Sequence, residues 1–255
     1  MEQHSASESR TVLVTGAGRG IGRAVAARFA AHGDRVVLHY HQSRPQAEAL
    51  VRQLKEEGVP AEHLLLCRAD LRQTADIEQL IQKATHRFGK IDILINNAGI
   101  GWNGLLTDMS ETEWDQLFAV NVKAVFTACR LVLPQMIQRK RGKIINISSM
   151  WGQAGASCEV AYAASKGALD AFTKGLALEV APSGITVNAV SPGVIATDIN
   201  AHLSPRELAA LAAETPLGRI GQPEEVAAAV FFLAGADADF ITGQILPVNG
   251  GFITA

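Results

Sequence analysis

Short apolar, β-branched segments alternate with longer segments of helical periodicity along most of the chain. Brief apolar runs bounded by turn residues indicate buried strands, whereas apolar residues that recur every three or four positions indicate helices. We expect strands at 11–15, 35–39, 63–70, 91–99, 143–148, 185–193 and 244–251. The first strand is followed by helical spacing of Ile21, Val25 and Phe29, and further helices are expected at 45–58, 74–89, 111–139, 160–180 and 223–235.

Nearly continuous apolar strands that alternate with helices predict a parallel sheet covered on both faces. Right-handed crossovers then give an α/β fold of the doubly wound, Rossmann type, with about seven strands in the order 3-2-1-4-5-6-7. Ligands of such sheets bind beyond the carboxyl ends of the strands. One composite site is therefore expected from the polar and turn residues at these ends, Thr15, Asp70, Asn96, Asn97, Ser149 and Pro192.

Composition narrows the possible classes of protein. The chain has 255 residues, 48% hydrophobic and 19% charged, with no internal linker, so we expect a flexible tail at 1–10 and one domain at 11–255. A net charge of −2 and only one short basic stretch, 139–143, argue against nucleic acid. Three scattered cysteines without a CxxC pair argue against a metal site. No signal segment or bilayer-length apolar run is seen, so we expect a cytoplasmic protein.

A glycine-rich turn, TGAGRGIG at 15–22, follows the first predicted strand and opens the first helix. Glycines let the turn tighten and let the backbone approach a pyrophosphate, and the helix N-terminus adds unpaired N–H groups and partial positive charge. A preceding strand and a following helix are the context in which this motif indicates a dinucleotide site. We therefore expect Gly16, Gly20 and Gly22 to bind a cofactor.

The segment after the second strand, HYHQSR at 39–44, contains no Asp or Glu. NAD-binding proteins of this fold usually carry an acidic residue there, which hydrogen-bonds the ribose 2′-hydroxyl. Arg19 in the turn and Arg44 beyond the strand can instead pair with a 2′-phosphate. We expect NADP(H) as the cofactor.

Tyr162 and Lys166 stand four residues apart and so share one face of the helix predicted at 160–180. An ammonium group this close favours the phenolate, so we expect the pKa of Tyr162 to lie below its usual value of about 10. A tyrosine with a lowered pKa can act as a general acid or base near neutral pH. Lys166 is also expected to hydrogen-bond the hydroxyl groups of the nicotinamide ribose.

Ser149, which stands thirteen positions before Tyr162, is expected to donate a hydrogen bond to a substrate carbonyl oxygen. Ser148 points to the opposite side of the strand, so only one of the two serines can serve. Asn121 lies inside a predicted helix, where asparagine is a poor helix former. Two roles stay open for Asn121: it orients a water molecule behind Lys166, or it distorts the helix.

The chain resembles the short-chain dehydrogenase/reductase family over about residues 11–252. The motifs that carry the resemblance are, in order, TGAGRGIG, NNAG (96–99), Asn121, Ser149, YAASK (162–166) and SPGVIAT (191–197). The resemblance implies a single-domain Rossmann-type fold, a homotetramer, and hydride transfer from a nicotinamide to a ketone. It also implies that four residues are catalytic, namely Asn121, Ser149, Tyr162 and Lys166.

The same resemblance implies positions for the cofactor. Asn97 is expected behind the adenosine ribose, Asp70 and Leu71 at the adenine, and Ile195 and Thr197 at the carboxamide and phosphate end. The complete set expected at the cofactor is Gly16, Arg19, Gly20, Ile21, Gly22, Ser43, Arg44, Asp70, Leu71, Asn97, Gly99, Tyr162, Lys166, Pro192, Gly193, Ile195 and Thr197.

Three segments, ITVNAVSPGVIATD, PLGRIGQPEEVA and ITGQILPVNGGF, are most similar to the 3-oxoacyl-[acyl-carrier-protein] reductases, which use NADPH in fatty acid biosynthesis. Two others, at 38–43 and 149–168, are similar to bacterial reductases of a 5-aminopentanone group on elongation factor P. An NAD(P)-linked alcohol or sugar dehydrogenase is a further alternative, which the missing acidic residue disfavours. A non-enzymatic NADP sensor also stays open, although all four catalytic positions are filled.

Substrate and partners are less defined. Users of acyl carrier protein often carry a basic residue near the start of the sixth strand, where this chain has Ser183, and this leaves Lys140 and Arg141 as docking charges. The expected partners are a free or carrier-bound ketone, with acyl carrier protein or elongation factor P as the carrier. Segment 197–216 is expected to close over the substrate as a lid.

Overall fold

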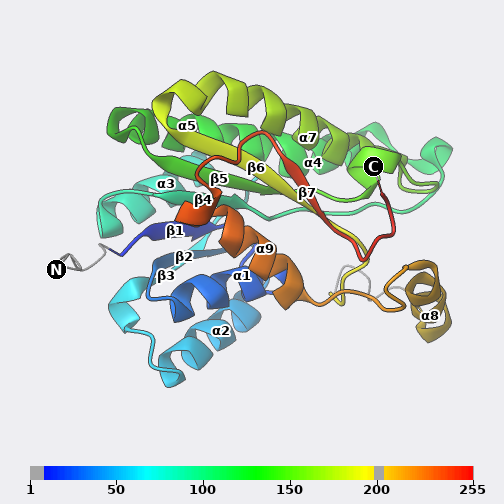
Figure 1. Ribbon diagram of the computed structural model, residues 1–255, viewed down its shortest axis with the longest axis horizontal. Helices are drawn as coiled ribbons and strands as arrows, with labels where there is room; N and C mark the ends of the chain where they lie inside the picture. The colour runs from blue at the N-terminus through cyan, green and yellow to red at the C-terminus, as the bar shows by residue number, and fades with distance from the viewer. Residues whose placement is uncertain (1–8, 198–203, 255) are drawn as a thin grey trace.

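The computed structural model describes residues 9–197 and 204–254, and it shows one seven-stranded parallel sheet between two layers of helices (Figure 1). The strand order is β3-β2-β1-β4-β5-β6-β7, as predicted. The strands are β1 Thr11–Val14, β2 Arg35–Tyr40, β3 Leu64–Arg68, β4 Ile93–Asn96, β5 Gly142–Ile147, β6 Ile185–Pro192 and β7 Ile245–Val248.

The helices also follow the predicted order along the chain. They are α1 Gly20–Ala31, α2 Arg44–Glu56, α3 Thr74–Phe88, α4 Glu111–Phe118, α5 Ala124–Arg139, α6 Trp151–Ala154, α7 Val160–Val180, α8 Pro205–Glu214 and α9 Pro223–Leu233. The long helix predicted at 111–139 is α4 and α5 joined by a π-helical turn, Ala119–Lys123. Short 3₁₀ turns lie at Ala61–His63, Leu106–Asp108, Ala181–Ser183 and Ala236–Ala238.

Helices bury both faces of the sheet (Figure 1). Helices α1, α2 and α9 cover one face, where Phe29 and Leu38 are fully buried. Helices α3, α5 and α7 cover the other, where Leu94 and Met136 are fully buried. Because both faces are covered, the strands are apolar at almost every position, which is the pattern seen in the sequence.

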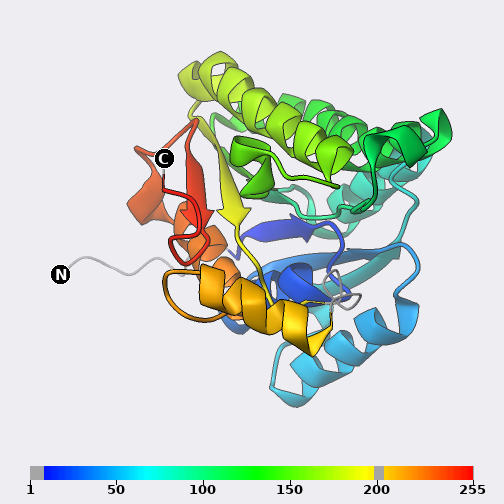
Figure 2. The same ribbon diagram turned by 90° about the vertical axis from the view of Figure 1, so that its right-hand side faces the viewer.

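Two sequence-based expectations fall partly outside the described residues, namely the flexible tail at 1–10 and the lid at 197–216. Arg10, at the end of the expected tail, makes an ion pair with Asp34 at 2.7 Å and donates a hydrogen bond to Ala234 O at 3.1 Å. Within the expected lid, α8 stands apart from the helical layers, on the side of the strand carboxyl ends (Figures 1 and 2).

One continuous helical stretch, Glu111–Arg139, has the length and the mean hydropathy of a membrane-crossing helix. In the fold, its α5 portion packs against α3 and the sheet, and Val132 and Met136 are fully buried there. Core helices of α/β proteins share this composition, so the stretch is accounted for by its place in the core.

Candidate active site

A cleft of about 900 Å³ lies along the carboxyl ends of the strands, where ligands of this type of fold bind. Its volume suits a ligand of cofactor size. All residues predicted at the cofactor line this cleft except Arg44. Ser149 lines it as well, whereas Asn121 lies behind its wall and is 1% exposed.

The glycine-rich turn forms a part of the cleft where side chains do not fit. A Cβ atom on Gly22 would lie 2.2 Å from Gly16 O, and one on Gly18 would lie 2.4 Å from Ser43 Oγ. Gly20 has a φ of +52°, in the left-handed region that favours glycine. Helix α1 begins at Gly20, so its unpaired N–H groups and partial positive charge face the cleft. These features fit the pyrophosphate of a dinucleotide.

His39, at the end of β2, holds this turn in place and was not identified from the sequence. Gly16 N–H donates to His39 Nδ1 at 3.0 Å, so the ring proton is on Nε2, which donates to Ala69 O at 3.1 Å. Burial lowers the pKa of His39 to about 4. A neutral imidazole therefore ties the turn after β1 to the end of β3.

The adenosine end of the predicted site contains several charged groups. Arg19 lines the cleft, whereas Arg44 is exposed on α2 and pairs with Glu48 at 2.8 Å. Arg72, which we did not single out from the sequence, also lines the cleft. Its guanidinium binds Asp70 at 2.6 Å, and this hydrogen bond lowers the pKa of that carboxyl to about 2.

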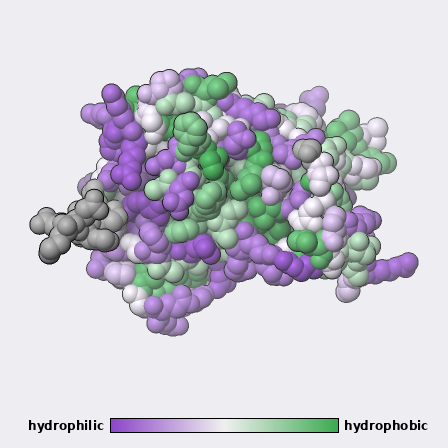
Figure 3. Space-filling view, in the orientation of Figure 1, coloured by the Kyte–Doolittle hydropathy of each residue, from purple (hydrophilic) through white to green (hydrophobic). Residues whose placement is uncertain are grey.

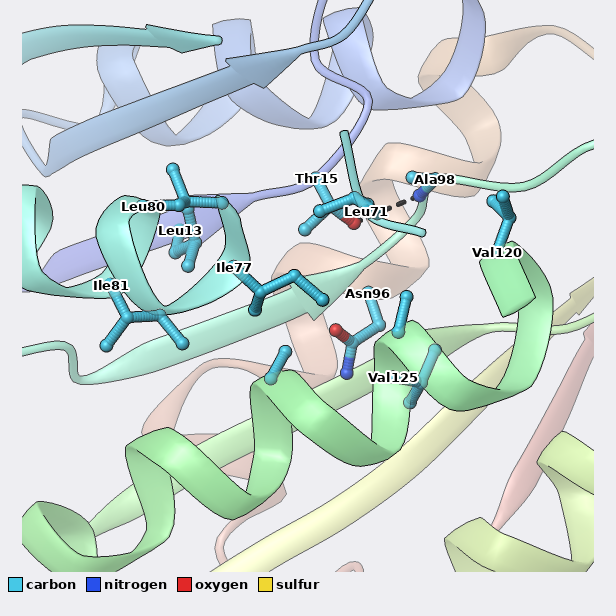
Figure 4. A pocket seen from close by; sticks show the side chains of 12 residues that line it. Leu13, Thr15, Leu71, Ile77, Leu80, Ile81, Asn96, Ala98, Val120 and Val125 are labelled. Carbon is cyan, nitrogen blue, oxygen red and sulfur yellow. Dashed lines mark hydrogen bonds between the residues drawn. The ribbon is translucent and has the colours of Figure 1, made fainter. Parts of the chain in front are cut away.

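Thr15 and Asn97 shape the middle of the cleft. The Thr15 hydroxyl accepts hydrogen bonds from Asn97 N–H at 2.9 Å and, as Figure 4 shows, from Ala98 N–H at 3.0 Å. Asn97 Nδ2 donates to Thr15 O at 2.8 Å, so the turn after β4 is fixed to the turn after β1. The apolar cavity behind them, in Figure 4, has a volume of only about 10 Å³, so the core beneath the site is tightly packed.

Ser149, Tyr162 and Lys166 meet at the other end of the cleft. Burial raises the pKa of Tyr162 to about 12, and a hydrogen bond with Ser149 partly opposes this rise. Lys166 is 4% exposed, and its Nζ donates to Ile147 O at 2.8 Å. Burial lowers the pKa of Lys166 to about 8. The phenol is thus held protonated next to a serine hydroxyl.

The predicted lowering of the Tyr162 pKa is therefore wrong in direction. We expected the ammonium to lower the pKa of the phenol, but that pKa is raised. The reason is geometric: Lys166 Nζ lies over the tyrosine ring, 5.7 Å from its centre, and its hydrogen bond goes to the backbone. Removal of the phenol from water then decides the direction of the shift.

Asn121 lies in the π-helical turn between α4 and α5. Its side chain bridges to Ile100, donating to the carbonyl and accepting from N–H, both at 2.9 Å, and it donates to Ser165 Oγ at 3.0 Å. A Cβ atom on Gly99 would lie 3.4 Å from Asn121 Oδ1 and 3.5 Å from Lys166 Nζ, so both atoms border one small space. The helix is distorted at Asn121, and the predicted role with water stays a prediction.

Some residues of the cleft were missed because no motif marks them. Trp102 after β4, Trp151 at the start of α6 and Glu159 just before α7 line it.

Comparisons with known proteins agree with this geometry. Residues 16–253 match the family model described as Enoyl-(Acyl carrier protein) reductase. The chain is 40% identical over 243 residues to the 3-oxoacyl-[acyl-carrier-protein] reductase FabG of Staphylococcus aureus, which covers 95% of this chain and 98% of that protein. It is 42% identical over 244 residues to the enzyme of that name from Escherichia coli, covering 96% and 97%. It is also 40% identical over 245 residues to Uncharacterized oxidoreductase YmfI of Bacillus subtilis, covering 96% and 99%.

Proposed function

Because this chain belongs to the short-chain dehydrogenase/reductase family, we propose that it reduces a ketone to a secondary alcohol with NADPH, and that the ketone is a 3-oxoacyl group on acyl carrier protein. The observation that carries the proposal is one cleft lined by the glycine-rich turn, Ser149, Tyr162 and Lys166. Side chains for proton transfer thus lie beside a place suited to a dinucleotide.

The proposed chemistry divides the work among these residues. When bound, the nicotinamide supplies a hydride to the carbonyl carbon. Ser149 donates a hydrogen bond to the carbonyl oxygen, and Tyr162 gives that oxygen its proton. Lys166 then returns a proton to the tyrosine oxygen and binds the ribose hydroxyls. A water molecule held near Asn121 then returns a proton to Lys166. The space next to Gly99, which both Asn121 Oδ1 and Lys166 Nζ border, supports this role.

NADP(H) is proposed over NAD(H) on the basis of charge. The cleft beyond β2 is lined by His41, Gln42 and Ser43, none of which is a carboxylate that would repel a 2′-phosphate. Arg19 lines the same region and offers a guanidinium to it. The nearby carboxylate of Asp70 is already paired with Arg72.

Oxidation of NADPH in the presence of acetoacetyl-acyl carrier protein, monitored through the loss of the absorbance of the reduced cofactor, tests this function directly. We expect turnover with NADPH and a kcat/KM for NADH at least roughly tenfold lower, as expected where a guanidinium pairs with the 2′-phosphate. Similar values for the two cofactors would refute the choice of cofactor. No turnover with any acyl-carrier thioester, in a preparation that binds NADPH, would refute the substrate.

A second candidate substrate is the 5-aminopentanone group on elongation factor P, and Glu159 favours it. Glu159 lines the cleft and stands three residues before Tyr162. Burial raises the pKa of the Tyr162 phenol most, and the charge of Glu159 raises it further. Trp102 and Trp151 line the same cleft. A carboxylate near aromatic rings suits an ammonium group on the substrate.

Two matched small ketones separate these candidates: a quaternary aminoketone, 5-(trimethylammonio)-2-pentanone, which carries a fixed positive charge and cannot cyclise, and 2-pentanone, which carries no charge. If the second candidate holds, wild-type kcat/KM is at least roughly tenfold higher for the aminoketone, and Glu159→Gln removes this preference. Equal values in the wild-type protein favour the acyl substrate. The modified elongation factor and acetoacetyl-acyl carrier protein are then compared side by side.

We also propose that the protein is a cytoplasmic homotetramer. Large apolar side chains are exposed on α5 and α7, and Phe126, Ile137 and Leu178 are 48%, 45% and 80% exposed. Apolar side chains also gather across the middle of one face, over β6 and β7 (Figure 3). Such surfaces are typical of subunit contacts. Light scattering on the purified protein measures the number of chains.

A further inference from the structure

Asp170 is a buried acidic residue that the chemistry proposed above does not use. It is 6% exposed, and within the described part of the chain neither of its carboxylate oxygens has a partner with hydrogen-bond geometry, although the Ser148 hydroxyl lies close enough to lower the pKa of the carboxyl. Burial of a carboxylate without partners is unfavourable, so its presence in a folded protein requires a compensating interaction.

One of the groups whose charge acts on Asp170 is the lysine of the proposed active site. Tyr162, Lys166 and Asp170 follow one another every four residues on α7, so they lie on one face in three successive turns. Side chains of a helix lean toward its N-terminus, which directs Lys166 toward Tyr162 and Asp170 toward Lys166. Burial lowers the pKa of Lys166 to about 8, and the charge of Asp170 is the influence that raises it.

The other groups near Asp170 favour its ionised form. Burial raises the pKa of Asp170, whereas Ser148, Lys174 and Lys166 lower it. Lys174 is exposed one turn further along α7, and Ser148 follows the end of β5 with its hydroxyl directed at Lys166 O, 3.5 Å away. Asp170 thus lies between two cations, one of which is in the active site.

For the reaction proposed above, we propose that Asp170 is a positioning residue whose buried negative charge, one turn beyond Lys166, keeps the Lys166 ammonium charged beside Tyr162. A neutral lysine cannot stabilise the phenolate that remains after Tyr162 gives up its proton. It also cannot return a proton to that phenolate. Loss of the Asp170 charge therefore reduces ketone reduction first at high pH, where Lys166 is closest to losing its proton.

The test is the dependence of kcat on pH in Asp170→Asn, with Glu179→Gln as a control that removes an exposed negative charge from the same helix. An opposite charge about one turn away changes a pKa by roughly one or more. The alkaline decline of kcat should therefore move down by about one pH unit in Asp170→Asn, which is about a fivefold loss at pH 8 and less than about twofold at pH 6. Asp170→Glu should restore the profile, and Glu179→Gln should leave it unchanged.

A second measurement does not depend on turnover. Competitive acetylation of lysines across pH, read by mass spectrometry, reports the titration of Lys166 in each variant. Its midpoint should fall by about one pH unit in Asp170→Asn, even if the substrate proposed above is wrong. If the asparagine variant does not fold, Asp170→Leu provides a neutral replacement of similar size.

Two results would overturn the proposal. One is an unchanged Lys166 midpoint in the neutral variants. The other is a loss of kcat that is equal at every pH, which would give Asp170 a purely structural role. A wild-type protein that reduces no ketone, but in which the Lys166 midpoint still depends on Asp170, would instead refute the proposed function alone.

Discussion

Acid should loosen the cofactor turn through His39, and the size of the effect can be worked out from its buried ring. The ring is 2% exposed, with Nδ1 accepting from Gly16 N–H and Nε2 donating to Ala69 O. Protonation at Nδ1 would place two N–H groups against each other. Burial, the largest cause, lowers the pKa of His39 from 6.5 to about 4.

The pKa of His39 is lower in the folded than in the unfolded protein. At pH values between these two pKa values, the unfolded chain therefore binds more protons than the folded one. Stability from the neutral ring is thus fully present above about pH 6.5 and is lost as the pH falls toward 4. A tenfold change in the proton affinity of one group corresponds to about 1.4 kcal/mol. Between about pH 7 and pH 4.5 the folded state should lose roughly 2–3 kcal/mol through this one residue.

Urea unfolding of the wild-type protein and of His39→Gln at the two pH values measures this loss. Gln stays neutral, so the variant should be less stable at pH 7 but should lose roughly 2 kcal/mol less on acidification than the wild type. His86→Gln, at an exposed position on α3, is the matched control and should retain the full wild-type loss. An identical acid loss in wild type and His39→Gln would refute the reasoning.

Further predictions concern the active site. Tyr162→Phe should lower kcat by roughly 10²–10⁴-fold with NADPH binding intact by fluorescence titration, and near-normal turnover would exclude the phenol as the acid. Gly22→Ala should abolish NADPH binding, because its Cβ would lie 2.2 Å from Gly16 O, and calorimetry measures this. Arg19→Ala should raise KM for NADPH by roughly tenfold or more and leave KM for NADH almost unchanged. In the wild type, kcat should decline as the pH rises through about 8, where Lys166 loses its proton.

The fold could be predicted almost completely, because each strand is buried on both faces and so is apolar at nearly every position. The strand order and the helix at 160–180 are confirmed. The distortion of the helix at Asn121 could be predicted only in part. A residue that is a poor helix former indicates a distortion, but it does not indicate that the distortion is a π-helical turn. Family membership was predicted from ordered motifs and is confirmed by the matching relatives.

The positions of site residues could be predicted where the course of the backbone alone fixes them. They were harder to predict where a side chain can interact with more than one partner. The glycines at the end of β1 reach the cleft because the turn leads there. Arg44, beyond β2, was expected to pair with a 2′-phosphate. In the structure it pairs instead with Glu48, one helical turn away. His39 and Asp170 carry no motif, and their importance comes only from what surrounds them once the chain is folded.

Burial also fits the proposed role of Tyr162 as proton donor, although the pKa of the phenol moves in the unexpected direction. Tyr162 and Lys166 have similar pKa values in water, but removal from water raises the pKa of the neutral acid and lowers that of the cationic one, to about 12 and about 8. The phenol is therefore fully protonated when a ketone arrives, as a donor must be. Once it has given up its proton, the ammonium is by far the stronger acid of the two, so proton return from Lys166 to Tyr162 is favourable. In the proposed reaction, the separation of the two pKa values by a shared environment thus sets the order in which the protons move.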